Sequence, residues 1–186
     1  VITNMEHIPH PECSQAPINM HKLIGCTQRT QGLMVARGNP LGLQSLQDVA
    51  NGKVRFVNRA IGTGTRVVLD ELLLQAGLQS RAISGYDSTE PSHTAVAHAI
   101  ASGAADAGLG IEVAARAQGL DFVPLAQENY WLVCLKSALD TPPIVQLRQV
   151  LQSQGWQQQV EQLAGYEMPS DCGCVQSLKQ RLPWWP

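Results

Sequence analysis

Apolar residues recur at helical spacing in two clear stretches of the chain. Between Arg66 and Ala76 the apolar side chains fall on one face, and Gly77 stands where a helix commonly ends. A second stretch of this kind begins after Ser92, a favourable capping residue, and ends near Gly103. The pattern therefore predicts two amphipathic helices, over 66–76 and 93–102.

Short apolar or alternating runs between these stretches predict strands. The strands expected are 33–36, 54–57, 82–83, 106–111, 122–125 and 130–135. Weaker helical patterns predict further helices over 43–49, 112–118, 143–152 and 155–163, while residues 1–21 show no period and predict a loop or tail. Strands and helices that alternate in this way are typical of an α/β fold, in which helices cover both faces of a sheet.

Composition narrows the classes of function. The net charge of −2 gives no electrostatic reason for direct nucleic-acid binding, and no apolar run approaches the ~20 residues that a membrane insertion requires. Five irregularly spaced cysteines argue against a disulfide framework and favour a reducing compartment. We expect no metal site, either at Cys172 and Cys174 or at the cluster of His7, His10 and Cys13.

A glycine-rich turn between a strand and a helix carries the candidate chemistry. The turn Gly62–Thr65 follows the strand that ends at residue 57, so the first amide groups of the next helix have no intrahelical acceptor and favour an anion. Thr63 and Thr65 offer hydroxyl donors, and Arg59 and Arg66 offer positive charge. The alternative stays open that the turn only starts and caps a helix, with both arginines in solvent.

The same turn resembles the Arg-x-x-Gly-Ser-Gly-Thr loop of type II periplasmic binding proteins, here Arg59 followed by Gly62–Thr65. The wider pattern is similar to the PBP-like domain of molybdate-binding type. The matching segments are Arg37–Gly42, Asn58–Arg66, Leu69–Asp70, Gly85–Tyr86, His93–Ala97, Ser102–Gly110 and Leu120–Leu125. Such domains occur fused to DNA-binding regulators or to molybdopterin-biosynthesis proteins.

The resemblance implies two lobes, of which one is incomplete, because the family's first lobe includes a large N-terminal portion that is not found in these residues. A fragment of a longer chain, a late start and completion by a partner chain all remain open. The expected parts are a lead-in with a remnant of the first lobe over 1–28 and a hinge-crossing strand over 29–42. A second lobe with the anion loop follows over 43–126, and a return strand with first-lobe helices over 127–186.

The resemblance also implies a ligand, a small tetrahedral oxyanion, with no other cofactor. Phosphate binders of this class place an acidic residue at the position of Ile61, where it accepts a hydrogen bond from the protonated oxygen of a monohydrogen anion. Ile61 cannot accept such a bond, and the site therefore favours a fully ionised anion such as molybdate or tungstate. His93 and Thr94, at the start of the second helix, form a second candidate cradle, or else lie beside a plain helix cap. A tyrosine of molybdate transport relatives would fall near Ile111.

We therefore expect a binding module without catalytic residues, since Ser92 and His93 are only sequence neighbours and no nucleophile elbow occurs. The predicted function is a cytoplasmic oxyanion sensor that is part of a regulator or of molybdenum-cofactor metabolism. A DNA-binding domain, fused or in a partner chain, and a homodimer are compatible with it. The alternatives are a periplasmic solute-binding component of a transporter and a module for assembly that binds nothing.

Overall fold

The computed structural model describes residues 20–181, with no account of the side chain of Gln180. Within this range the strand order is β3-β2-β4-β1-β5, and β6 and β7 also pair with β1. The strands are β1 (His21–Val35), β2 (Phe56–Arg59), β3 (Thr89–Glu90), β4 (Ala107–Ile111), β5 (Asp121–Leu135), β6 (Tyr166–Glu167) and β7 (Val175–Ser177). The helices are α1 (Leu46–Asn51), α2 (Gly64–Gln75), α3 (His93–Ala101), α4 (Glu112–Ala117), α5 (Pro142–Leu151), α6 (Gln154–Glu161) and α7 (Leu178–Arg181). Short 3-10 turns occupy Ser80–Ala82 and Lys136–Ala138.

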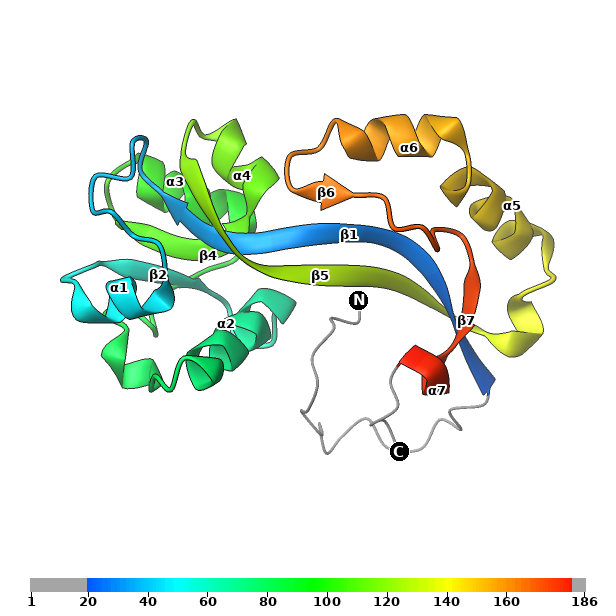
Figure 1. Cartoon of the computed structure of the whole chain (residues 1–186), viewed down its shortest axis with the longest axis horizontal. Helices are drawn as coiled ribbons and strands as arrows, with labels where there is room; N and C mark the ends of the chain where they lie inside the picture. The colour runs from blue at the N-terminus through cyan, green and yellow to red at the C-terminus, as the bar shows by residue number, and fades with distance from the viewer. Residues whose placement is uncertain (1–19, 182–186) are drawn as a thin grey trace. The chain divides into compact units, whose positions relative to one another are not determined.

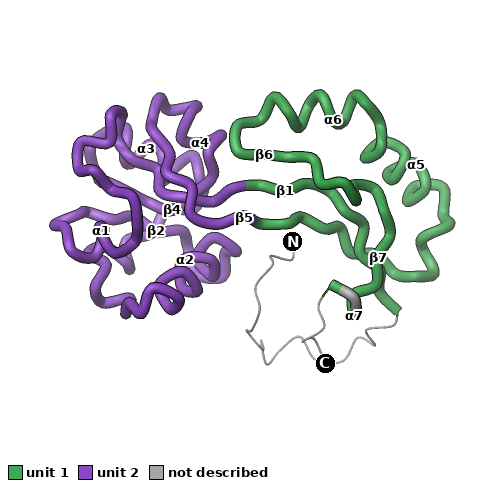
Figure 2. The backbone as a smooth tube through the Cα atoms, in the orientation of Figure 1, with its two compact units in different colours: residues 1–29, 128–186 green, residues 30–127 purple. Residues whose placement is uncertain are grey.

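The chain divides into two compact units, shown in Figure 2. Unit 2 is Thr30–Gln127, and unit 1 comprises the described residues of Val1–Arg29 and Glu128–Pro186. The long strands β1 and β5 each contribute residues to both units. Each unit therefore contains part of the sheet and its own hydrophobic core.

Unit 2 is a sheet with helices on both faces, as Figure 1 shows, with α3 and α4 on one face and α1 and α2 on the other. The α3 face has a core of mostly small and branched side chains, among them Val57, Val96 and Ala97, to which Met34 adds a long one. Gly108 lets α3 approach closely, because a Cβ atom there would lie 2.6 Å from the Val96 side chain. On the other face, Leu69 and Leu73 of α2 are buried.

Unit 1 is smaller and holds two clusters. One packs Leu23 of β1 against Trp131 of β5 and Leu178 of α7. The other packs Ile24 of β1 against Leu151 of α5 and Cys172. Strand β1 is central to unit 1, since both β6 and β7 pair with it in antiparallel fashion.

The α/β fold class is confirmed, whereas several predicted elements were wrong in extent. The predicted strand over 82–83 is not a strand, because Ser80–Ala82 form a 3-10 turn that leads to a tight contact of Gly85 with Phe56. Strand β1 begins twelve residues before the predicted start at 33, and β5 joins the two predicted strands 122–125 and 130–135 into one. Strands β3, β6 and β7 were not predicted; each is only two or three residues long.

Candidate functional site

Three helices of unit 2 begin at one edge of its sheet. Strands β3 and β4 both run parallel to β2, which lies between them. Each of the three is followed closely by a helix: α2 after β2, α3 after β3 and α4 after β4. Because the carboxyl ends of parallel strands share an edge, the positively polarised starts of these helices gather there. In α/β sheets this edge is where ligands bind.

The predicted anion loop lies at this edge, between β2 and α2. Thr63 caps α2: its hydroxyl oxygen accepts a hydrogen bond from the Arg66 amide at 3.4 Å. The same hydroxyl donates to the Ala60 carbonyl at 2.8 Å, so it closes the loop from within. Gly62 has φ of +85°, a conformation that favours glycine. Thr63 and Gly62 therefore shape the loop, as the sequence suggested for a helix cap.

Gly64 is the open point of this loop. It is the first residue of α2, so its amide has no acceptor within the helix, and the residue is exposed. A Cβ atom at Gly64 would meet no atom within 4 Å, and its φ is not positive. Neither packing nor backbone conformation requires glycine here, and its absence of a side chain leaves the amide accessible. Thr65, in contrast, is only 2% exposed.

Arg59 connects the loop to the start of α3. It ends β2 opposite Glu90 of β3, and its side chain is partly buried. Its Nη2 donates to the carbonyl oxygen of Pro91 at 3.1 Å, just before the cap of α3. The guanidinium is thus fixed at the same edge as Gly64, where it brings positive charge.

Arg66 has a different environment. It is 7% exposed, and its guanidinium lies 3.8 Å from the centroid of the Tyr86 ring. Nη1 donates to the Tyr86 carbonyl at 3.2 Å, and Nε lies 3.7 Å from an Asp70 carboxylate oxygen. The Tyr86 hydroxyl also donates to Asp70. Burial, and then the bond to Asp70, raise the pKa of Tyr86, so the ring stays neutral at physiological pH. We call Arg66, Asp70 and Tyr86 the Tyr86 clamp.

Asn58 joins the clamp to the sheet. It is fully buried, and its Nδ2 donates to the same Tyr86 carbonyl at 3.1 Å. Its Oδ1 accepts from the Arg59 amide at 2.8 Å. From its sequence Asn58 was expected in the segment Asn58–Arg66, but without a role. Its bond to the Arg59 amide holds the backbone where β2 ends.

His93 and Thr94 begin α3 at the same edge. Ser92 caps this helix by accepting from the Ala95 amide at 3.0 Å. His93 is partly buried against Gly110 of β4, where a Cβ atom would lie 3.3 Å from Nδ1. Thr94 is exposed. The structure thus brings Arg59, the 62–66 loop and the start of α3 together in one unit.

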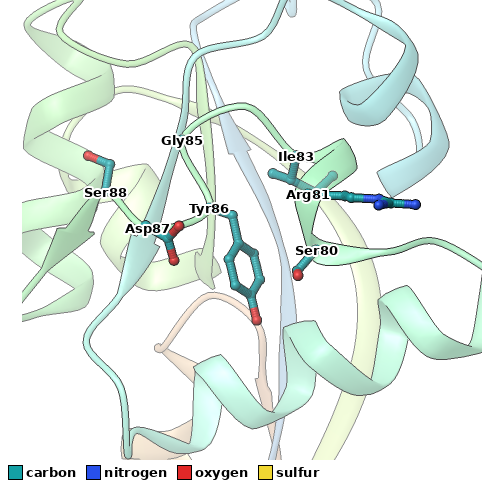
Figure 3. Close-up of a pocket in the computed structure, with 7 residues that line it drawn as sticks. All are labelled: Ser80, Arg81, Ile83, Gly85, Tyr86, Asp87 and Ser88. Carbon is teal, nitrogen blue, oxygen red and sulfur yellow. The ribbon is translucent and has the colours of Figure 1, made fainter.

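A separate hollow of about 360 Å³ lies beside the Tyr86 clamp. Figure 3 shows Asp87 and Arg81 on opposite sides of the Tyr86 side chain. The hollow is lined by Ser80, Arg81, Ile83, Gly85, Tyr86, Asp87 and Ser88. None of the predicted ligand-binding residues lines it. The Tyr86 carbonyl connects it to Arg66 and Asn58, and the Ser88 carbonyl accepts a further hydrogen bond from the Asn58 amide at 2.8 Å.

Gln31 of β1 is a polar residue at this edge that the sequence analysis placed only in a hinge strand. It is 0% exposed and lies opposite Ile111 of β4. In the sequence Gln31 is the last of five polar residues that begin at Thr27, directly before the apolar run Gly32–Val35, so no local signal distinguishes it.

Within residues 20–181, no group of three or more His, Cys, Asp or Glu side chains could hold a metal ion. His7, His10 and Cys13 lie outside the described residues. Within the same range, no helix has both the length and the apolar character needed to cross a bilayer.

Comparison with known proteins gives relatives of uncharacterised function and solved structures of binding proteins. The uncharacterised protein YvgK of Bacillus subtilis (strain 168) is 36% identical over 145 residues, 78% of this chain. The chain spans about half of that relative's length, 46%.

Two solved structures share the fold. The arginine-, lysine-, histidine-binding protein ArtJ of Geobacillus stearothermophilus has a TM-score of 0.56 and 15% identity, over 97% of this chain and 71% of that one. Peb3 of Campylobacter jejuni, bound to L-phospholactate, has a TM-score of 0.54 and 18% identity, over 78% of this chain and 68% of that one. A profile of the PBP superfamily domain matches residues 4–152, and the chain accordingly belongs to that family of domains.

Proposed function

We propose that this chain binds a small solute through an anionic group held by the Gly64 amide and Arg59. The observation that carries the proposal is the exposed Gly64 at the start of α2, a glycine that neither packing nor backbone conformation requires. A helix start with an accessible amide attracts negative charge, and a guanidinium nearby adds to the attraction. The structural neighbours support the proposal, because L-phospholactate, arginine, lysine and histidine all carry a carboxylate.

Binding rather than catalysis is the role that these side chains favour. Ser92, which precedes His93 in sequence, accepts a hydrogen bond from the Ala95 amide as a helix cap. Thr63 is committed to Ala60 and to Arg66 in the same manner. Both hydroxyls therefore serve the backbone, and a nucleophile needs a hydroxyl that is paired with a base.

The preferred anion is one without a proton. Ile61, in the middle of the loop, is 85% exposed and offers no side-chain acceptor. A protonated oxygen placed at a site of donors loses a hydrogen bond, which costs about 1–3 kcal/mol when it is buried. We therefore propose that the loop prefers carboxylates and fully ionised dianions such as molybdate, tungstate or sulfate over monohydrogen phosphate.

The first candidate for the whole protein is the solute-binding component of a transporter. A further structural neighbour is named as an extracellular-binding protein of an amino-acid ABC transporter, ytmK of Bacillus subtilis. This favours the periplasmic or extracellular alternative over the cytoplasmic location that the sequence analysis preferred.

One observation favours the second candidate, a cytoplasmic sensor joined to another domain. Cys26, Cys134, Cys172 and Cys174 are all free thiols in the structure. Proteins exported to oxidising compartments commonly pair their cysteines. The redox state of these thiols in protein isolated from its native cells separates the two candidates.

A thermal-shift and calorimetry screen tests the proposed function. Molybdate, tungstate, sulfate, phosphate and the amino acids are added one at a time, and a bound anion raises the melting temperature by linkage. Arg59→Gln should weaken binding about 10- to 100-fold, the equivalent of a lost charge-assisted hydrogen bond. Arg81→Gln, at an exposed arginine away from the loop, is the matched control and should bind as the wild type does.

Two results count against the proposal. If no anion stabilises the protein, the loop is only a helix start. If phosphate binds more tightly than molybdate, the argument from Ile61 is wrong even though the loop binds anions.

A further inference from the structure

The Gln31 side chain is buried without a hydrogen-bond partner. Neither its Nε2 nor its Oε1 is bonded to any of the described residues, and the residue is 0% exposed. A buried amide left in this state costs about 1–3 kcal/mol for each unsatisfied group. A cost of this size at one position calls for a partner outside the described residues, such as a bound solute or an ordered water molecule.

Gln31 lies at the edge of the unit 2 sheet where the carboxyl ends of β2, β3 and β4 meet. It pairs with Ile111, the last residue of β4, while Val57 of β2 pairs with Gly108. Continuing that parallel ladder by two residues places Arg59 level with Gly110. Gln31 and Arg59 therefore stand at the same end of the sheet, two strands apart, which is about 10 Å.

The amide also lies on the face that α2 covers. Cβ atoms at Gly32 and Gly110 would meet Phe122 and His93, respectively, so these positions face α3 and its core. Side chains alternate along a strand, and Gln31 therefore points to the opposite face, the face of α2. The start of α2 and the Gln31 amide thus share one edge and one face.

We propose that Gln31 is a specificity-determining residue, which bonds a second polar group of the solute whose anionic group binds at Gly64 and Arg59. This inference rests on the proposed function. The two strands lie about 10 Å apart, so a solute that extends beyond its anionic group is suited to reach both positions. A carboxamide offers one acceptor and two donors without charge. The solute class is therefore an organic anion with an uncharged or ammonium-type polar group beyond its anionic end.

The competing explanation is a buried water molecule on Gln31, which would satisfy the amide regardless of ligand. If the Gln31 amide is only structural, its removal should lower the stability of the protein and leave ligand preference unchanged. If Gln31 determines specificity, its removal should leave the stability unchanged or raise it, and should change ligand preference. The two explanations thus differ in two separate measurements.

The first measurement is made without ligand. Gln31→Met keeps the length of the side chain and removes its polar atoms, and we expect the melting temperature to stay the same or rise. The matched control is Gln28→Met on the same strand, where Nε2 donates to the Asn129 side chain at 2.6 Å. That variant loses an existing hydrogen bond, so its melting temperature should fall. If the melting temperature of Gln31→Met falls as far as that of Gln28→Met, the Gln31 amide has a partner in the ligand-free protein and the inference is wrong.

The second measurement is ligand affinity by calorimetry. The probes are sulfate and molybdate as bare anions, and O-phosphoserine, 3-phosphoglycerate and the amino acids as organic ones. We expect the wild type to bind an organic probe most tightly, and Gln31→Met to lose about 10-fold in that affinity. Its affinity for sulfate or molybdate should remain unchanged, as should every affinity of Gln28→Met.

The possible failures can be told apart. If anions bind the wild type and Gln31→Met binds every probe equally well, the inference fails while the proposed function stands. If the wild type prefers a bare dianion to all organic probes, the inference also fails. If Arg59→Gln and the wild type both bind nothing, the proposed function fails and the inference fails with it.

Discussion

Arg66 is buried, and its guanidinium group contacts other residues of the chain. Its guanidinium contacts the Tyr86 ring, the Tyr86 carbonyl and the Asp70 carboxylate. A planar guanidinium can stack and donate at once, which an ammonium group cannot. We expect Arg66→Lys to lower the free energy of unfolding by about 1–3 kcal/mol, measured by urea denaturation.

The control for this prediction is Arg81→Lys, at an exposed arginine that should tolerate the change. If Arg66→Lys keeps full stability but loses anion affinity, Arg66 is a direct ligand contact, as the sequence analysis expected. Equal stability together with equal affinity would leave the Tyr86 clamp without a function.

Cys172 gives the protein a stability that depends on alkaline pH. The thiol is 8% exposed and donates to the carbonyl oxygens of Cys26, at 2.9 Å, and Leu151, at 3.3 Å. Burial raises the pKa of Cys172 from 9.0 to about 11. The folded state therefore holds this proton more tightly than the unfolded state does. Its contribution is complete below pH 9 and is lost as the pH rises from 9 towards 11.

Urea denaturation at several pH values between 8 and 11 measures this effect. The decline in stability should be shallower in Cys172→Ala than in the wild type. Cys174→Ala is the matched control, because Cys174 is exposed, and it should follow the wild-type slope. Parallel slopes for all three proteins would show that the Cys172 thiol does not contribute.

At the scale of elements, the loop before α2 contains two glycines, of which only one needs to be glycine. Gly62 has φ of +85°, which favours glycine, whereas Gly64 is the first residue of α2 and has open space where a Cβ atom would lie. Gly62→Ala should therefore cost about 1–2 kcal/mol of stability. Gly64→Ala should raise stability by about 0.4–1 kcal/mol, because it restricts the unfolded chain. The added methyl group should nevertheless weaken anion binding, since it covers the accessible amide.

Melting temperature and calorimetric affinity, measured on the same two variants, check this pair of expectations. The discriminating result is a more stable Gly64→Ala that binds less well. A Gly64→Ala variant that binds as tightly as the wild type would remove the main support for the proposed function.

The sequence predicted the helices better than the strands. Helix α2 and the start of α3 have strong local signals, with apolar spacing and the caps Thr63 and Ser92. Strand β1 has polar residues from Thr27 to Gln31, which hide its period, and its pairing is with segments far away in sequence. Strand β5 is similarly interrupted by Gln127–Asn129. Pairing of this kind is tertiary, so no local pattern shows it.

The position of the candidate site could be predicted from the sequence, but the roles of its individual residues could not. The glycine-rich turn and its threonine cap could be recognised from their spacing. Arg59 and Arg66 could not be distinguished, because their partners are the carbonyls of Pro91 and Tyr86, at least 20 residues away. The unbonded amide of Gln31 depends on what surrounds it in three dimensions, and a sequence contains no such information.

At the scale of the whole molecule, β1 and β5 are the two strands that contribute to both units. Within unit 1 they carry a buried ion pair, in which Arg29 Nε lies 2.6 Å from a Glu128 carboxylate oxygen. The two side chains are 11% and 2% exposed. Arg29 also lies 4.5 Å from the centroid of the Tyr130 ring. Burial alone would lower the pKa of Arg29, but the charge and hydrogen bond of Glu128 outweigh it and raise that pKa above its ordinary value.

Removing one partner of this pair should be far more harmful than removing both. Glu128→Leu leaves a buried guanidinium without its counter-charge, which we expect to cost about 3–5 kcal/mol of unfolding free energy. The double variant Arg29→Met with Glu128→Leu fills the space with apolar atoms and should lie within about 1–2 kcal/mol of the wild type. Urea denaturation of the wild type, both single variants and the double variant forms a complete cycle. A loss in the double variant equal to the sum of the single losses would mean that the two charges do not interact.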